Sequence, residues 1–250
     1  MIRLIRAEFL KLRTTQVWFW LLMATIAVSG LLIVAQIAPS DGVRRADQVP
    51  DMFASSSTVD IVVFVLGVLA VTTEFRYQTI TPAVLQTPSR WAIVTAKMIT
   101  YAIVGVIYAL VAVVTQLAVA VPWLDAKNVD VEFGNGAVQH SIIGVFAVVA
   151  LYGIVGLGVG ALLRNQIVAV VVGLLFLLVL ENVTLAIPGV RHAWPYLPNG
   201  ASAAIINTGD THVTDGVYLI STAGGVLVLV LWAVIPAIAG AAFTMNRDIT

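Results

Sequence analysis

Six long runs of apolar residues take up most of this 250-residue chain. A helix needs roughly 20 predominantly apolar residues to cross a hydrocarbon core about 30 Å thick. Hydrophobic residues make up 60% of the chain and charged residues 10%. Soluble domains carry roughly 25% charged residues, so the composition excludes an ordinary soluble domain. The sequence therefore predicts an all-α integral membrane protein with six transmembrane helices.

The runs divide a single transmembrane domain, residues 1–250, into spans and connections. The predicted spans are 17–38, 58–73, 92–121, 139–163, 167–187 and 216–244. The third and sixth spans are long enough to tilt or to project from the bilayer. Three connections stand out in this division: residues 1–15 before the first span, 74–91 between the second and third, and 188–215 before the sixth.

Residues 1–15 are typical of a basic amphipathic helix. Glu8 and Lys11 lie away from its apolar face. The residues that share this face, at steps of three and four, are Ile2, Ile5, Phe9 and Leu12. A helix of this kind lies in the membrane interface with its apolar face toward the acyl chains. The alternative is a positively charged anchor for the first span.

The distribution of Lys and Arg predicts the orientation. If the N-terminus is cytoplasmic, nine of the 13 basic residues fall on that side: Arg3, Arg6, Lys11, Arg13, Arg76, Arg90, Lys97, Arg164 and Arg247. Cytoplasmic loops carry an excess of Lys and Arg in membrane proteins. We therefore expect both termini to be cytoplasmic and the number of spans to be even.

Residues 74–91 form a polar passage between two apolar spans. Pro82 and Pro88 bracket the apolar turn 83–85, and this arrangement suits a short helix lying across the membrane surface. Such a helix is well placed to dock into a protein outside the bilayer. The alternative for Phe75 and Arg76 is simple anchoring, because an aromatic ring sits at the headgroups and Arg extends its guanidinium to the interface.

Residues 188–215 are too apolar for a solvated loop and too short to cross the membrane. Their core runs from Pro195 to Pro198, and Trp194 and Tyr196 suit the headgroup level. We expect a re-entrant or interfacial segment here.

The fourth span carries a small-residue face that allows close helix packing, either within the subunit or at a dimer seam. Its glycines are Gly153, Gly156, Gly158 and Gly160.

Glu181 is the one acidic residue well inside an apolar run. Acidic residues within spans are costly and are functional candidates by default. Three roles stay open for Glu181: structural pairing with a partner such as Arg191, contact with a cationic substrate, and proton transfer. Candidates for a substrate path are Phe64, Phe176, Glu181 and Asn182. Because no polar cluster defines a hydrophilic pore, a lipophilic or amphipathic cargo is favoured.

Several functional classes receive no support. The chain has no cysteine, and its three histidines lack the spacing of a zinc site. No Gly-Lys pair occurs, so the chain carries no phosphate-binding loop for a nucleotide. The formal net charge of +0 gives no argument for nucleic acid as a partner. We therefore predict no catalytic, cofactor-binding or metal-binding residues in this chain.

Two segments carry a family resemblance. They are RLIRAEFLKLRTT before the first span and GVLAVTTEFRYQTITPAVLQTPSRWAIVTAK after the second. The sequence resembles the membrane subunit of small bacterial ABC-2 type exporters. In that family a glycine-containing span ends in Glu-aromatic-Arg, followed by a Thr-Ile/Leu pair, an apolar turn, Pro-Ser/Thr-Arg and a Lys. Gln78 stands where many relatives carry glycine.

The resemblance implies an ATP-driven transporter in the bacterial cytoplasmic membrane. Two copies of a separate ABC ATPase subunit, which bind ATP and Mg, would pair with this chain and a second permease, identical or homologous. Residues 74–91 would hold the coupling helix, and residues 1–15 the connecting helix beside it. The residues that would couple to the ATPase are Glu74, Phe75, Arg76, Thr79, Ile80, Leu85, Pro88 and Arg90.

The implied function is outward movement of a hydrophobic or amphipathic compound, such as a drug, antibiotic, peptide or lipid-like molecule. An ion-coupled secondary transporter using Glu181 is the first alternative, although internal repeats or broken helices typical of such carriers are not evident. A non-transporting scaffold or sensor subunit is the second alternative, and it would lack the bracketed turn 82–88.

Overall fold

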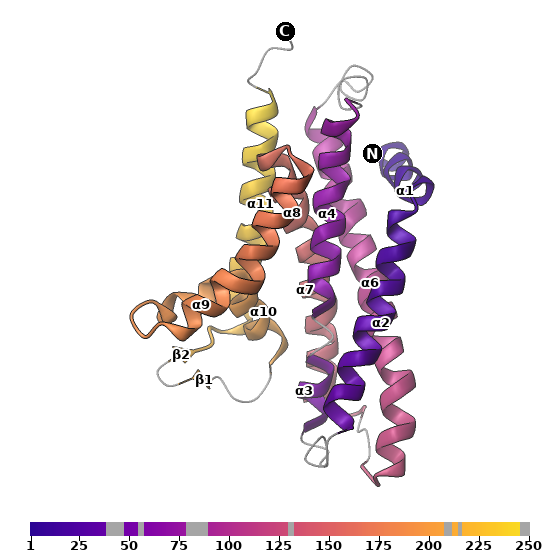
Figure 1. The fold of residues 1–250 in the computed structure, drawn as a ribbon, viewed down its shortest axis with the longest axis vertical. Coiled ribbons are helices and arrows are strands. Elements are labelled where there is room, and N and C mark those ends of the chain that lie inside the picture. The colour runs from indigo at the N-terminus through magenta and orange to yellow at the C-terminus, as the bar shows by residue number, and fades with distance from the viewer. Residues whose placement is uncertain are drawn as a thin grey trace.

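A computed structural model describes residues 1–38, 48–54, 58–78, 90–129, 133–207, 212–214 and 217–245. Helices dominate this part of the chain (Figure 1). In chain order they are α1 (Ile2–Thr14), α2 (Val17–Ile37), α3 (Val49–Ala54), α4 (Val59–Arg76), α6 (Arg90–Ala126), α7 (Gly136–Leu163), α8 (Gln166–Leu175), the π-helix η3 (Phe176–Leu180), α9 (Glu181–Ala186), the 3₁₀-helix η4 (Arg191–Tyr196), α10 (Pro198–Ile206) and α11 (Thr222–Met245). A two-stranded antiparallel sheet joins β1 (His212–Thr214) and β2 (Val217–Tyr218).

Six segments of the described chain are long and apolar enough to cross a membrane. They are α2, α3 with α4, α6, α7, the continuous run of α8, η3 and α9, and α11. The prediction of an all-α integral membrane protein with six spans is confirmed. The 37 residues of α6 correspond to about 55 Å of helix, well beyond a hydrocarbon core of about 30 Å.

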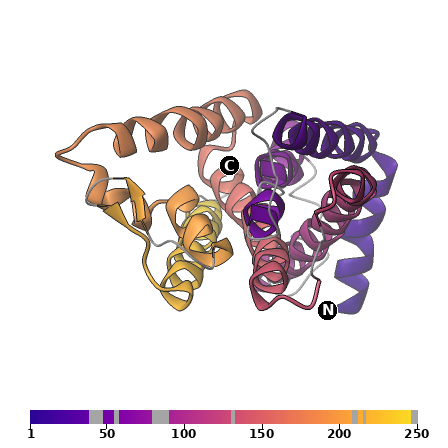
Figure 2. The same cartoon turned by 90° about the horizontal axis from the view of Figure 1, so that it is seen from below.

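The helix α7 lies at the centre of the molecule and contacts α4, α6, α10 and α11 (Figure 2). Its glycines allow this close approach. A Cβ on Gly156 would clash with the carbonyl oxygen of Phe64 in α4, and a Cβ on Gly67 would clash with the carbonyl oxygen of Gly153. Gly158 faces α11, where a Cβ would come within 2.8 Å of the Ala237 nitrogen. The small-residue face therefore packs within the subunit, the first of the two predicted alternatives.

Element ends differ from the predicted spans where polar side chains find partners. α4 continues beyond the predicted span 58–73 to Arg76, and Glu74 in this extension is buried against other helices. α11 begins at Thr222 rather than near Gly216. Residues 217–218 are taken up by β2, and the Ser221 hydroxyl accepts a hydrogen bond from the Gly224 N–H at 3.2 Å, as an N-cap does.

The predicted re-entrant or interfacial segment contains η4 and α10. α10 is a nine-residue helix packed between α7 and α11, and most of its residues are buried. Pro198 opens it, which suits the first turn of a helix because the missing N–H has no partner there in any case. α1 and the C-terminal end of α11 lie at one end of the bundle, and α3 lies at the other (Figure 1).

Candidate functional site

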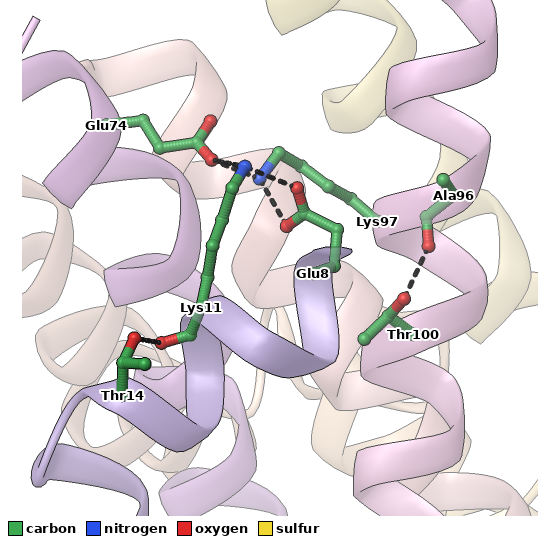
Figure 3. Close-up of polar contacts among 7 residues, drawn as sticks. All are labelled: Glu8, Lys11, Thr14, Glu74, Ala96, Lys97 and Thr100. Atoms are coloured by element: carbon green, nitrogen blue, oxygen red, sulfur yellow. Dashed lines mark hydrogen bonds and ion pairs between the residues drawn. The ribbon is translucent and has the colours of Figure 1, made fainter. Parts of the chain in front are cut away.

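Four charged side chains from three helices meet at the end of the bundle that carries α1 (Figure 3). Lys97 of α6 places its Nζ 2.7 Å from Glu8 Oε2 and 2.7 Å from Glu74 Oε1. Lys11 places its Nζ 2.7 Å from Glu8 Oε1 and 2.9 Å from Glu74 Oε1. These residues, Glu8, Lys11, Glu74 and Lys97, are called the charge cluster below. Its formal charge is balanced, and it ties α1 to both α4 and α6.

The charge cluster is largely shielded from solvent. Glu8, Glu74 and Lys97 are 6%, 7% and 7% exposed, whereas the Lys11 side chain is 51% exposed. Burial by itself would raise the pKa of the Glu8 carboxyl, but Lys97 and Lys11 outweigh it and hold that pKa below its usual value. Burial would lower the pKa of Lys11, and the hydrogen bonds and charges of Glu8 and Glu74 raise it instead. Both groups are therefore stabilised in their charged forms.

Local helix geometry brings these groups together. Glu8 and Lys11 are three residues apart on α1 and so lie on one side of it. Phe9 and Leu12 on the apolar face pack against the main hydrophobic core, while Ile2 is 82% exposed. The helix 2–14 matches the predicted amphipathic element, and Glu8 lies away from its apolar face but is buried within the protein. Its carboxylate faces α6 because Lys97 supplies a buried counter-charge there.

Sequence reasoning missed the charge cluster as a unit. It treated Glu74 as a charge offered to a partner protein, yet Glu74 is buried and paired within the chain. The available signals were Glu8, the acidic residue of an otherwise basic segment, and Lys97, a cation beyond the start of an apolar span. Neither signal identifies a pairing partner that is tens of residues away.

Phe75 and Arg76 follow the charge cluster and contact the turn between α7 and α8. The Arg164 guanidinium lies 5.8 Å from the Phe75 ring centroid, and Arg76 Nη1 donates to Gln166 Oε1 at 3.3 Å. The turn is sharp because Arg164 adopts a left-handed conformation (φ 51°) and the Asn165 side chain caps α8. Phe75 is half-buried, whereas Arg76 is exposed and stays accessible from outside the bundle.

After α4 the backbone turns at Gln78, whose φ of 54° lies in the left-handed region that glycine adopts most readily. This conformation accounts for the glycine that the resemblance leads one to expect at this position. The helix α6 begins at Arg90. Four predicted coupling residues lie outside the described residues: Thr79, Ile80, Leu85 and Pro88.

A second polar network surrounds Glu181 at the start of α9. Glu181 is fully buried, and its Oε2 accepts a hydrogen bond from the Asn199 backbone N–H at 2.8 Å. Asn199 Nδ2 donates to the Leu177 carbonyl at 2.7 Å, and Asn199 Oδ1 accepts from the Tyr152 hydroxyl at 2.8 Å. Among the described residues Glu181 forms no ion pair with Arg191. Glu181 is therefore hydrogen-bonded to the N-terminal turn of α10, rather than paired with Arg191 as the sequence had suggested.

The other candidates for a substrate path have structural roles in the described chain. Phe64 is 1% exposed and its ring fills the space beside Gly173 of α8, so it is a packing residue. Phe176 packs against Trp232 of α11, with ring centroids 5.4 Å apart. Asn182 is exposed and donates to the Leu178 carbonyl of its own helix. Their place on a substrate path stays a prediction.

The fold and these two networks define a multi-pass membrane protein whose short N-terminal helix is locked to the ends of two spans by buried charges. Comparison with known families gives a more specific assignment. The family model described as ABC-2 family transporter protein matches residues 4–180, which include most of α1, the charge cluster, the first four spans and most of the fifth. The chain belongs to this family. A search of curated proteins found no match. Membership makes the chain a membrane component of a transporter and implies association with an ABC ATPase.

Proposed function

We propose that the chain is the permease subunit of an ATP-driven exporter in the bacterial cytoplasmic membrane. It acts with two copies of a separate ATPase subunit and with a second permease, identical or homologous. The cargo is a hydrophobic or amphipathic compound that moves out of the cytoplasm. Both termini face the cytoplasm in this proposal, as the excess of Lys and Arg near α1 and near the end of α4 indicates.

The observation that carries the proposal is the position of the charge cluster. Glu74 lies near the end of α4 and Lys97 near the beginning of α6, so the two flank the connection that holds the predicted coupling residues. Both are bound to α1 through Glu8 and Lys11. A force applied to this connection would therefore move α1, α4 and α6 together instead of bending one helix.

The packing of α4 gives that movement a route into the membrane. Gly67 and Gly156 place α4 and α7 in backbone contact, and the Phe64 ring rests against Gly173 of α8. Such close contacts leave little room for relative sliding, because interiors are packed at the density of organic crystals. We infer that a tilt of α4, driven by ATP-dependent closure of the ATPase pair, displaces α8 and α9 and changes access to the cargo path.

Co-purification tests the proposal. The tagged chain, isolated from native membranes in mild detergent, should bring an ATPase with a phosphate-binding loop, and that complex should hydrolyse ATP. Arg76→Ala should lower the amount of ATPase retained, because the exposed Arg76 guanidinium is available to a partner. Arg13→Ala is the matched control, since Arg13 is also basic and exposed at the same end of the bundle.

Transport assays separate the proposal from its alternatives. If the purified chain alone moves cargo in response to an ion gradient, the secondary-transporter hypothesis replaces the proposal. If the ATPase is retained but no tested hydrophobic or amphipathic compound changes its rate or crosses the membrane, a scaffold or sensor role is favoured instead.

A further inference from the structure

A cavity of about 310 Å³ lies where the first turn of α4 meets α10, in the part of the molecule away from α1. The polar residues that line it include Asp60, Asn199, Ser202 and Asn207. Ala203 and Ile206 of α10 supply apolar lining. This volume is at the lower end of the range for small-molecule sites, which is roughly 300–1,000 Å³. The cavity can therefore hold a head group or a short chain rather than a whole drug-sized molecule.

Asp60 is the acidic residue of this cavity lining. It is 5% exposed, and it forms no ion pair with a Lys or Arg of the described residues. Asp60 lies in the first turn of α4, where the helix dipole favours a negative charge. Burial opposes this ionised form, so a cation bound beside Asp60 would stabilise the carboxylate. Because no Lys or Arg of the described residues pairs with Asp60, a cationic ligand can take the place of its counter-ion.

The part of the cavity lining that α10 supplies is pre-organised. Asn199 is held through its backbone N–H, its Nδ2 and its Oδ1 by Glu181, Leu177 and Tyr152. Ser202 Oγ donates to the Pro198 carbonyl at 2.7 Å, which fixes its rotamer. Glu181 is fully buried directly behind Asn199, and its Oε1 has no hydrogen-bond partner among the described residues. Through its Oε2, Glu181 holds the Asn199 backbone in place from behind the cavity.

We propose that the cavity binds the ammonium head group of a cationic amphipathic molecule. The Asp60 carboxylate accepts a charge-assisted hydrogen bond from the ammonium, and the Asn199 and Ser202 side chains add neutral polar contacts. The alkyl part lies against Ala203 and Ile206. The proposal of an ammonium-binding site depends only on the cavity and its lining residues. Its identification as a cargo site rests on the proposed exporter function.

A pair of probes that differ in charge tests the site. Octylammonium and octanol have the same alkyl chain, and octylammonium carries a positive charge at pH 7. Binding to the full chain in phosphatidylcholine nanodiscs is measured by calorimetry, with empty nanodiscs subtracted. Wild-type protein should bind octylammonium at least about tenfold more tightly than octanol, which corresponds to about 1.4 kcal/mol. Equal affinities would overturn the proposal, whatever the variants do.

Three variants locate the site. Asp60→Asn should abolish the preference for octylammonium while octanol binding stays within about twofold. Asp51→Asn is the matched control, because Asp51 is an exposed carboxylate on α3 outside the lining, and the preference should be retained. Ala203→Phe should weaken both probes by filling the cavity. A preference that survives Asp60→Asn, or tight sodium binding that displaces octylammonium, would refute the assignment.

The outcome is separable from that of the exporter proposal. If octylammonium binds as expected but no ATPase co-purifies, the binding site stands and the exporter function fails. If an ATPase co-purifies and is active but the probe preference is absent, the exporter function stands and the ammonium site fails.

Discussion

Replacing Lys97 with methionine removes one positive charge from the charge cluster and keeps an unbranched apolar side chain that is one atom shorter. Lys97 Nζ lies 2.7 Å from both Glu8 and Glu74, and its side chain is 9% exposed. The variant leaves two buried carboxylates facing each other with only Lys11 between them. Because Lys11 is half exposed, it compensates them incompletely. We expect α1 to separate from α4 and α6 more often.

The size of the effect follows from burial. Removing one partner of a buried ion pair costs about 3 to 5 kcal/mol, so the equilibrium between docked and undocked α1 should shift roughly 100-fold or more. Lys11→Met removes a cation whose side chain is 51% exposed, and solvent-exposed pairs contribute about 0 to 1 kcal/mol. Its shift should stay below about fivefold. Adding Glu74→Gln to Lys97→Met should recover part of the loss, because it removes one uncompensated carboxylate.

The absence of native cysteine makes the measurement direct. A single Leu12→Cys reporter lies on the face of α1 that packs against the core, so maleimide reacts with it when α1 undocks. The labelling rate should rise roughly 100-fold in Lys97→Met and only slightly in Lys11→Met. Equal rates in the two variants, or no recovery with Glu74→Gln, would show that burial of the charges does not hold α1 in place.

Three further predictions concern packing, pH and the second network. Gly156→Ala should destabilise the purified protein by about 1 to 3 kcal/mol and lower its thermal unfolding midpoint, because the added Cβ clashes with the Phe64 carbonyl. An unchanged midpoint would contradict this packing. Because the Glu8 pKa is lowered, docking of α1 should be constant above about pH 4.5 and should weaken as the pH falls through the folded-state pKa. Spin-label distances between α1 and α6 measure this docking. Weakening that begins near pH 7 would exclude Glu8 as the cause. Glu181→Leu should speed amide hydrogen exchange in α10, because it leaves the Asn199 N–H without an acceptor. Glu181→Gln keeps an acceptor oxygen and should not change the exchange rate. Equal exchange rates in the two variants would contradict this role.

The number and nature of the spans could be predicted because each depends on local composition. A run of about 20 apolar residues by itself indicates a membrane span, and the glycines at 153–160 indicate that another helix packs closely there. Span ends were less predictable. α4 extends past Glu74 because partners on α1 and α6 compensate that charge, and no window of sequence around Glu74 contains those partners.

The charge cluster and the cavity depend on contacts between distant parts of the chain. Glu8 and Lys97 are 89 residues apart and meet only after α1 folds back against α6. Glu181 was a sound candidate on sequence, but its acceptor role toward Asn199 requires α10 to enter between α7 and α11. Asp60 lies in the first turn of α4, and its cavity is completed by residues of α10, which are about 140 positions further along the chain.

The central claim is that α1, α4 and α6 transmit work from an ATPase as one unit. The most direct measurement is the number of cargo molecules moved per ATP hydrolysed, in proteoliposomes containing the chain and its ATPase. The Lys97→Met complex should keep the ATPase bound and hydrolysing, while that ratio falls at least about tenfold below the wild-type value. An unchanged ratio, or cargo movement by the chain without an ATPase, would contradict the claim.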